Sequence, residues 1–149
     1  MSDGAVVRLL VFRVGTLACA AEAEMVREIL PRFATTRIPG APAPVAGLMN
    51  VRGGLVTVVE GWRALGQPEP SAEAPERTTV LLELAGAHKV VGFTVDEVID
   101  LLSVGRDTLE PRQALPGIDP TLVRAVGRRA GQLFVVLDTD ALLTPIFAS

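Results

Sequence analysis

Short runs of apolar residues, many alternating with polar ones, cover most of the chain and predict β-strands. The first run spans residues 6–14, where one face of the predicted strand is fully apolar, and Gly15 follows it as a turn. The same signals predict extended segments over residues 17–21, 35–38, 45–52, 55–59, 78–84, 89–95, 98–104, 122–128 and 133–137. Short, closely spaced strands with glycine turns indicate an all-β protein. Because the two halves of the chain share this pattern, we expect two barrels.

Three segments carry helical signals. Residues 22–30 have apolar side chains at helical spacing, and Pro31 would end that helix. A short helix is expected at residues 62–66 and a closing helix at residues 141–147, after Asp138 as a helix N-terminal signal. Segments rich in proline or in polar residues predict loops at 39–44, 67–76 and 105–120.

The stretch from Val45 to Leu65 holds the polar positions that depart most from this apolar pattern. Asn50 and Arg52 share one face of the first strand, and Gly53-Gly54 supplies the positive φ of a tight two-residue turn. Arg52 would then point out of the end of the hairpin, as a contact residue or as an ordinary solvated arginine. The return strand is apolar on both faces, so Val58 is expected to be deeply buried.

Composition narrows the class of protein. With 149 residues the chain is long enough for one domain with a sizeable core, and its low aromatic content of 4% leaves that core to Val, Leu, Ala and Ile. A formal net charge of −3, without any Lys/Arg block, makes nucleic acid an unexpected partner. One cysteine and one histidine provide neither a disulfide nor a metal cluster, so we expect no metal and no cofactor.

We expect the protein to be cytoplasmic. The apolar segment before Cys19 resembles an export signal with a lipid-accepting cysteine, but Asp3 stands where a basic start belongs, and Arg8 and Arg13 interrupt the segment. No later run approaches the roughly 18–20 apolar residues of a membrane span. A single cysteine also fits a reducing compartment.

Few residues qualify for chemistry. His88 is the one side chain with an ordinary pKa near neutrality, but it lies in a turn without a nucleophile motif, so a plain turn histidine is the expectation. Cys19 lies among alanines, which favours a buried, inert thiol. The acidic pairs Asp96-Glu97 and Asp138-Asp140 stand at a strand end and a helix cap, where acids commonly serve structure. Trp62 either anchors its short helix on the core, our first expectation, or lies at a partner interface.

Six motifs in chain order carry a resemblance that covers nearly the whole sequence. They are LLVFRVG, VREIL, TRIP, VAGLMNVRG, VVGFTVDEV and GQLFVVLDTDALL. Each motif is weak alone, but together they are specific, and the chain resembles the CheW family of chemotaxis coupling proteins. The resemblance implies two intertwined five-stranded SH3-like barrels around a shared core, with short helices that include one near the C-terminus. It also implies a single CheW-like domain over residues 1–149, without catalysis.

The resemblance further implies a scaffold that joins the cytoplasmic tips of chemoreceptors, the methyl-accepting chemotaxis proteins, to the regulatory domain of a CheA-type histidine kinase. Such a protein would be recruited to receptor arrays without inserting into the membrane. The alternative is an accessory CheW-like scaffold that binds receptors or other CheW-like proteins and recruits no kinase. A small enzyme that uses His88 is a remote third possibility.

The family's receptor-binding positions can be carried over residue by residue. Asn50, Arg52 and Gly53 match the NxRG motif, whose arginine is implicated in receptor contact. Positions that line the same groove between the two subdomains correspond to Val26, Glu28, Val98 and Leu101. These seven residues are the predicted receptor-binding set.

A second group departs from the family pattern. Thr57, Glu60 and Gly61 stand where members usually have Pro, Asp and Leu, and with Trp62 they form the predicted kinase-facing surface. Thr57 restores a backbone donor, and Gly61 would leave out a side chain that otherwise packs beneath the Trp62 helix. We therefore expect the chain to bind receptor fragments more strongly than the kinase regulatory domain.

Overall fold

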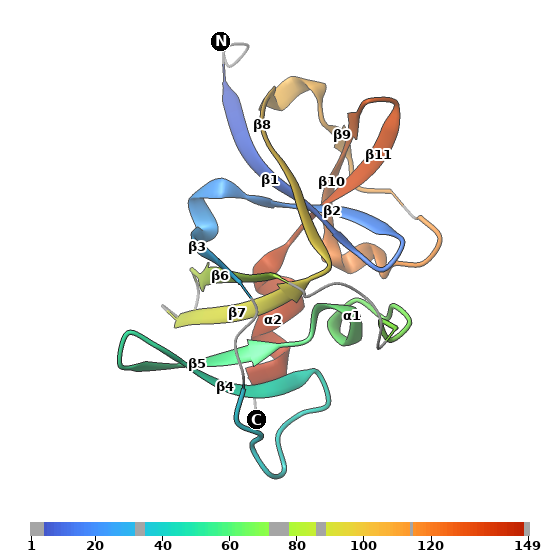
Figure 1. The fold of residues 1–149 in the computed structure, drawn as a ribbon. Helices are drawn as coiled ribbons and strands as arrows, with labels where there is room; N and C mark the ends of the chain where they lie inside the picture. Colours follow the sequence, from blue (N-terminus) through green and yellow to red (C-terminus); the bar gives the residue numbers. More distant parts are fainter. Residues whose placement is uncertain (1–4, 32–34, 72–77, 86–88, 114, 148–149) are drawn as a thin grey trace.

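The computed structural model describes residues 5–31, 35–71, 78–85, 89–113 and 115–147. Within them the chain forms two β-sheets, one above the other in Figure 1. The six-stranded sheet has the order β8-β1-β2-β11-β10-β9, with β1 Val6–Val14, β2 Leu17–Glu22, β8 Glu97–Gly105, β9 Glu110–Pro111, β10 Val123–Arg129 and β11 Gln132–Leu137. The five-stranded sheet has the order β3-β6-β7-β5-β4, with β3 Val26–Pro31, β4 Val45–Val51, β5 Gly54–Val59, β6 Thr78–Leu84 and β7 Lys89–Val95.

Each sheet is mixed, because it contains one parallel pair among antiparallel ones. Strand β11 lies parallel to β2, with Val136 opposite Ala20, and β5 lies parallel to β7, with Val58 opposite Gly92. These pairs bring together strands that are far apart in the sequence. The all-β class predicted from the apolar pattern is confirmed. We expected five strands in each barrel, and the six-stranded sheet exceeds this number by the two-residue strand β9.

Strand β1 is buried on both faces, because it lies between two hydrophobic cores. One core lies within the six-stranded sheet and the other is shared by both sheets. From β1 the first receives Val7, Leu9 and Val11, and the second receives Leu10, Phe12 and Val14. A continuous apolar run suits such a strand. The expectation of a single apolar face was therefore too narrow, since both faces of β1 enter a core.

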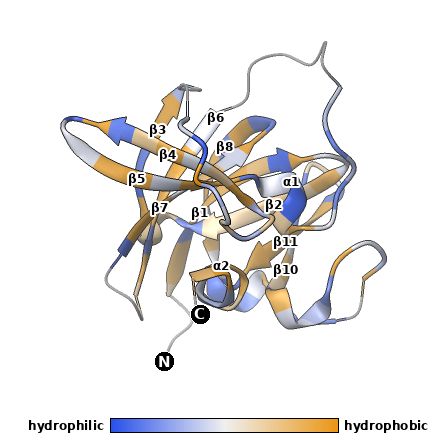
Figure 2. Cartoon of the chain, turned by 90° about the horizontal axis from the view of Figure 1, so that it is seen from below, coloured by the Kyte–Doolittle hydropathy of each residue, from blue (hydrophilic) through white to orange (hydrophobic). Residues whose placement is uncertain are grey.

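The shared core joins the two sheets. Phe12 of β1 packs edge to face against Phe93 of β7, with ring centroids 6.1 Å apart and an interplanar angle of 65°. Helix α2, Thr139–Phe147, adds Leu142 and Leu143 to the same core. Figure 2, seen from below, shows apolar residues along the strands that surround this helix. Residues from both ends of the sequence thus complete one core.

The chain passes from one sheet to the other at Asp96, between β7 and β8. The Asp96 carboxylate accepts hydrogen bonds from the Gly15 N–H at 2.9 Å and from the Arg13 guanidinium at 3.2 Å. In return, the backbone N–H of Asp96 donates to the Arg13 carbonyl at 2.8 Å. These three bonds fix the crossing to the turn between β1 and β2. These hydrogen bonds support the prediction that Asp96 has a structural role.

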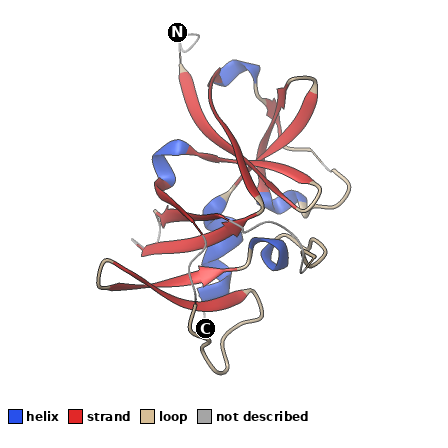
Figure 3. Cartoon of the chain, in the orientation of Figure 1, coloured by secondary structure: helices blue, strands red, loops and turns tan. Residues whose placement is uncertain are grey.

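The helix predicted over residues 22–30 is wrong. A 3-10 turn over Ala23–Met25 leads directly into β3, which Figure 3 shows as a strand paired with β6. The apolar pattern misled because Ile29 is apolar but 45% exposed, whereas burial along β3 alternates from residue to residue. β-branched side chains and pairing with β6 favour the strand.

Smaller differences concern the helices and loops. The short helix α1 spans Gly61–Ala64, and α2 is capped as predicted, since the Asp138 carboxylate accepts the Ala141 N–H at 3.0 Å. The predicted loop over 105–120 also contains the 3-10 turn Arg106–Thr108 and strand β9. Part of the loop predicted at 67–76 lies outside the described residues. In the part of the chain that is described, no helix has the length and apolar character to cross a membrane.

Val58 provides the sharpest test of this fold. It is 1% exposed in the small core of the five-stranded sheet, so Val58→Asp places an unpaired charge among apolar side chains. We expect the free energy of unfolding to fall by at least about 3 kcal/mol in urea titrations followed by circular dichroism. Leu55→Asp on the same strand is the control, because Leu55 is 69% exposed and should tolerate the charge. Equal stability of the two variants would contradict the described sheet.

Candidate partner-binding surfaces

The hairpin between β4 and β5 turns at Arg52 and Gly53. Both residues have positive φ, 51° and 86°, as a tight two-residue turn requires, whereas Gly54 already belongs to β5. The expected Gly53-Gly54 turn was therefore shifted by one residue. The Asn50 carboxamide oxygen accepts the Gly53 N–H at 2.9 Å, which stabilises this turn. Asn50 thus has a structural part in presenting Arg52.

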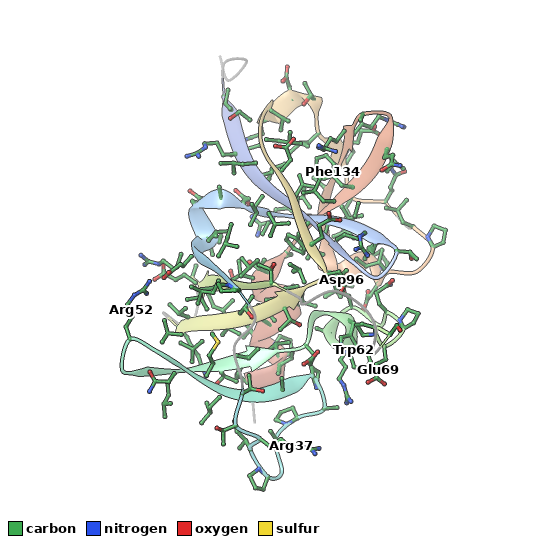
Figure 4. The ribbon with its side chains drawn as sticks, in the orientation of Figure 1. Arg37, Arg52, Trp62, Glu69, Asp96 and Phe134 are labelled. Carbon is green, nitrogen blue, oxygen red and sulfur yellow. The ribbon has the colours of Figure 1, made fainter. Side chains whose placement is uncertain are left out.

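Arg52 forms a two-point ion pair with Glu28, which lies on β3. One guanidinium nitrogen lies 2.7 Å from a Glu28 carboxylate oxygen, and the other nitrogen contacts the second oxygen. We call this pair the arginine clamp. It joins the hairpin turn to β3 across 24 positions of sequence. Figure 4 shows Arg52 at the far end of the hairpin, where its side chain is 70% exposed.

The clamp fixes the charge and the direction of both groups. Hydrogen bonds from Arg52, together with its positive charge, hold the pKa of Glu28 below its usual value. The same contacts raise the pKa of Arg52. A guanidinium has five N–H donors, so a two-point pair leaves others for a partner. Arg52 is therefore an exposed, oriented cation.

The apolar members of the predicted receptor set divide into buried and exposed residues. Val26 on β3 and Val98 on β8 are half-buried and pack against the shared core from different sheets. Leu101 on β8 is 49% exposed. Sequence reasoning missed Ile29, which is 45% exposed on β3 next to Glu28, because a helical period placed it on a buried face. Ile29 and Leu101 are thus apolar side chains available on these strands.

The four residues of the predicted kinase-facing surface have different environments. Thr57 is half-buried in the interior of its sheet, where β5 pairs with both β4 and β7. Glu60 and Trp62 border a hollow of about 760 Å³ between α1 and the loop over residues 38–44, which we call the Trp62 hollow. The Trp62 ring N–H donates to the Glu60 carboxylate at 2.7 Å.

Two further residues shape the Trp62 hollow. The Arg63 guanidinium lies 4.7 Å from the centre of the Trp62 ring, and it also donates to the Ala43 carbonyl at 3.3 Å. Arg37 borders the hollow from the segment before β4, and Figure 4 shows its position relative to Trp62. Half-buried Trp62 also packs against the shared core, so its two proposed roles are compatible. Neither arginine stood out in the sequence, because the loop that brings them together has no periodic pattern.

Gly61 is buried and cannot carry a side chain. A Cβ atom built on it would lie 2.1 Å from the Thr94 carbonyl oxygen, and the Gly61 N–H donates to the Thr94 hydroxyl at 3.0 Å. We expected Gly61 to leave a space that a side chain could fill beneath the helix, but this backbone has no such space. The close approach of α1 to β7 requires glycine here.

Comparisons with known proteins show the family of this chain. A family model for the CheW-like domain matches residues 8–146. The chain belongs to the CheW-like family. The chemotaxis protein CheW of Rhizobium meliloti (strain 1021) is 29% identical over 90% of this chain and 85% of that protein. A probable chemotaxis protein CheW of Rhizobium etli is 30% identical over 80% of this chain and 74% of that protein.

A solved structure agrees with the CheW-like fold. The scaffolding protein TtCheW from Thermoanaerobacter tengcongensis matches with a TM-score of 0.78 over 89% of this chain and 88% of that one. At 19% sequence identity this similarity shows the fold alone. Family membership confirms the resemblance inferred from the six motifs. The roles assigned to individual residues remain predictions.

Gly61 yields a test of the α1 surface. In Gly61→Ala the added methyl group meets the Thr94 carbonyl, so α1 must move away from β7. We expect a loss of about 1–3 kcal/mol in the free energy of unfolding. In the control, Gly54→Ala, the new Cβ lies 3.6 Å from its nearest neighbour, the Val51 carbonyl oxygen, so little change is expected. Equal stability of the two variants in urea would show that α1 does not need this approach.

Proposed function

We propose that this chain is a non-catalytic chemotaxis scaffold that couples chemoreceptors to a CheA-type histidine kinase. The observation that carries the proposal is the CheW-like match over residues 8–146, together with relatives named chemotaxis protein CheW that align over most of the chain. A scaffold without kinase recruitment is not favoured, because those relatives carry the name of the coupling protein itself. The chain acts as one CheW-like domain at receptor arrays in the cytoplasm.

The candidate chemical groups fit a role without catalysis. Cys19 is fully buried in β2, and this burial raises the pKa of its thiol, which keeps the group protonated and unreactive. Asp96 and Asp138 are engaged in the structural hydrogen bonds described above. His88 lies outside the described residues. These observations support binding, and not turnover, as the task of the surface.

The receptor tip binds at the arginine clamp and the neighbouring strand β3. Arg52 offers an oriented positive charge, and Ile29 offers an exposed apolar side chain beside Glu28. Val26 packs on the shared core on the same strand as Ile29, whereas Val98 and Leu101 lie on β8 of the other sheet. A partner for this surface presents acidic and aliphatic side chains. Charge at the rim then guides the encounter, and apolar contact holds the complex.

The kinase regulatory domain binds at the Trp62 hollow. Trp62 is the single tryptophan, and tryptophan and arginine are enriched among residues that dominate binding energy. Here Trp62 and Arg63 are held together by stacking, and Glu60 fixes the indole ring. Gly61 allows α1 to lie close to β7 next to this surface, and Thr57 lies in strand β5, which leads into α1.

Two variants separate the two surfaces. Arg52→Ala should weaken binding of a receptor-tip fragment at least tenfold and leave the kinase regulatory domain unaffected. Trp62→Leu, which keeps an apolar side chain against the core, should weaken kinase binding at least tenfold and leave the receptor fragment unaffected. Isothermal titration of each variant against each partner measures all four affinities.

A matched control tests whether any exposed arginine pair would give the same result. Arg128 on β10 pairs with Glu110 at 3.5 Å, and Arg128→Ala should change neither affinity. The unfolding midpoint of Arg52→Ala should stay close to that of the wild type, since the clamp lies on the surface. If Arg52→Ala binds the receptor as the wild type does, the clamp is not the receptor site. If Trp62→Leu retains kinase affinity, the hollow is not the kinase site.

A further inference from the structure

We propose that the six-stranded sheet contains a separate binding site, at the open end of its own core, for a small anion with an aliphatic chain, such as a medium-chain carboxylate. The site is distinct from the clamp on β3 and from the Trp62 hollow. It does not depend on the chemotaxis role. Four features of the structure support it: an unfilled apolar volume, the small residues that leave this volume open, the charges at its entrance, and the chemistry of its wall.

A hollow in the protein surface lies at one edge of the core of the six-stranded sheet. This hollow, of about 280 Å³, opens beside Val7 and Leu9 of β1 and Val136 of β11, all of them at most 6% exposed. Leu109 and Ala125 complete the apolar wall. The volume of the hollow is close to the lower end of the range for ligand pockets, which begins at about 300 Å³.

The size of neighbouring residues explains why the space remains. Phe134, labelled in Figure 4, fills the adjacent layer, and its ring packs where a Cβ on Gly127 would be, only 2.4 Å away. In the next layer Val136 lies opposite Ala125, which in turn pairs with Pro111 of the two-residue strand β9. Of the described residues on these strands, Glu110, Pro111, Arg124, Ala125 and Val136 line the hollow, so no large apolar side chain from them enters it. A single larger residue at position 125 would fill it.

The charges at the entrance leave one cation available. Arg124 lies 2.9 Å from Glu22, and Glu110 lies 3.5 Å from Arg128, so both carboxylates at the entrance have partners. Arg106 borders the same hollow, and among the residues that the structure describes no ion pair involves it. Its backbone N–H donates to the Ala5 carbonyl at 3.0 Å, which anchors it next to β1.

This combination selects a class of ligand. The inner wall consists of hydrocarbon side chains without hydrogen-bonding groups, so it suits an alkyl chain and disfavours sugars or nucleosides, whose hydroxyl groups would lose their hydrogen bonds with water. Arg106 can pair with a carboxylate head at the entrance by two parallel hydrogen bonds. An alkyl cation of the same length would meet an unfavourable charge. The predicted ligand is therefore an aliphatic carboxylate.

Three probes of equal chain length test the site on the full-length protein: octanoate, octanol and octyltrimethylammonium. Isothermal titration should give octanoate a Kd below about 1 mM, with octanol and the cation at least tenfold weaker. Octanoate should also raise the thermal midpoint, and the rise should continue with the logarithm of its concentration above Kd. If the three probes bind equally, the association is only unspecific apolar adsorption and the proposal is wrong.

Variants locate the binding. Arg106→Glu should reduce octanoate affinity at least tenfold, whereas Arg37→Glu, the control in the segment before β4, should leave it unchanged. Ala125→Phe should abolish binding by filling the hollow. If Ala125→Phe unfolds, chemical shifts of the amides of Val7, Leu9 and Val136 in the wild type provide the second measurement, since octanoate should perturb them first. Wild-type affinity in Arg106→Glu, or shifts confined to other residues, would overturn the assignment.

Discussion

The packing of Phe12 against Phe93 joins the two sheets, and it fixes the surfaces of the five-stranded sheet relative to those of the six-stranded sheet. Both rings are fully buried in a core that also receives Leu142 and Leu143 from the C-terminal helix. Truncating such a phenylalanine costs about 3–5 kcal/mol. That is a large part of the roughly 5–15 kcal/mol by which a domain is stable. The sheets are therefore expected to fold and unfold as one unit, with Asp96 fixing the point where the chain crosses between them.

Around this centre, the proposed binding groups lie on a turn and on a short connecting helix. The arginine clamp uses a turn whose positive φ values are supported by Asn50, and it reaches across to Glu28 on another strand. The Trp62 hollow uses a short helix that Gly61 allows to approach β7 closely. In both places the scaffold fixes a charged or aromatic side chain at the surface before any partner arrives, which lowers the entropy lost on binding.

The strands could be predicted from the sequence because alternation and apolar runs report burial directly, and Val58 is a clear example. The segment at Val26 was mistaken for a helix because the apolar Ile29 lies on the exposed face of β3, and pairing with β6 reveals the strand. Contacts between segments that are distant in the sequence could not be predicted from the sequence. The pair of Glu28 with Arg52 depends on sheet order, and the steric need for Gly61 depends on where Thr94 lies. A motif located Arg52 and the single tryptophan pointed to Trp62, whereas the contacts that orient both came from the fold.

A coupling scaffold must hold both partners at once, so simultaneous binding is the most direct test. Sedimentation velocity of this protein mixed with a receptor-tip fragment and a kinase regulatory domain, each above its own Kd, measures the species formed. Because the shared core keeps the clamp and the Trp62 hollow on different parts of one rigid body, a ternary complex should sediment faster than either binary complex. If the receptor fragment instead displaces the kinase domain and only binary complexes form, the two surfaces overlap and the account of this protein as a coupler is wrong.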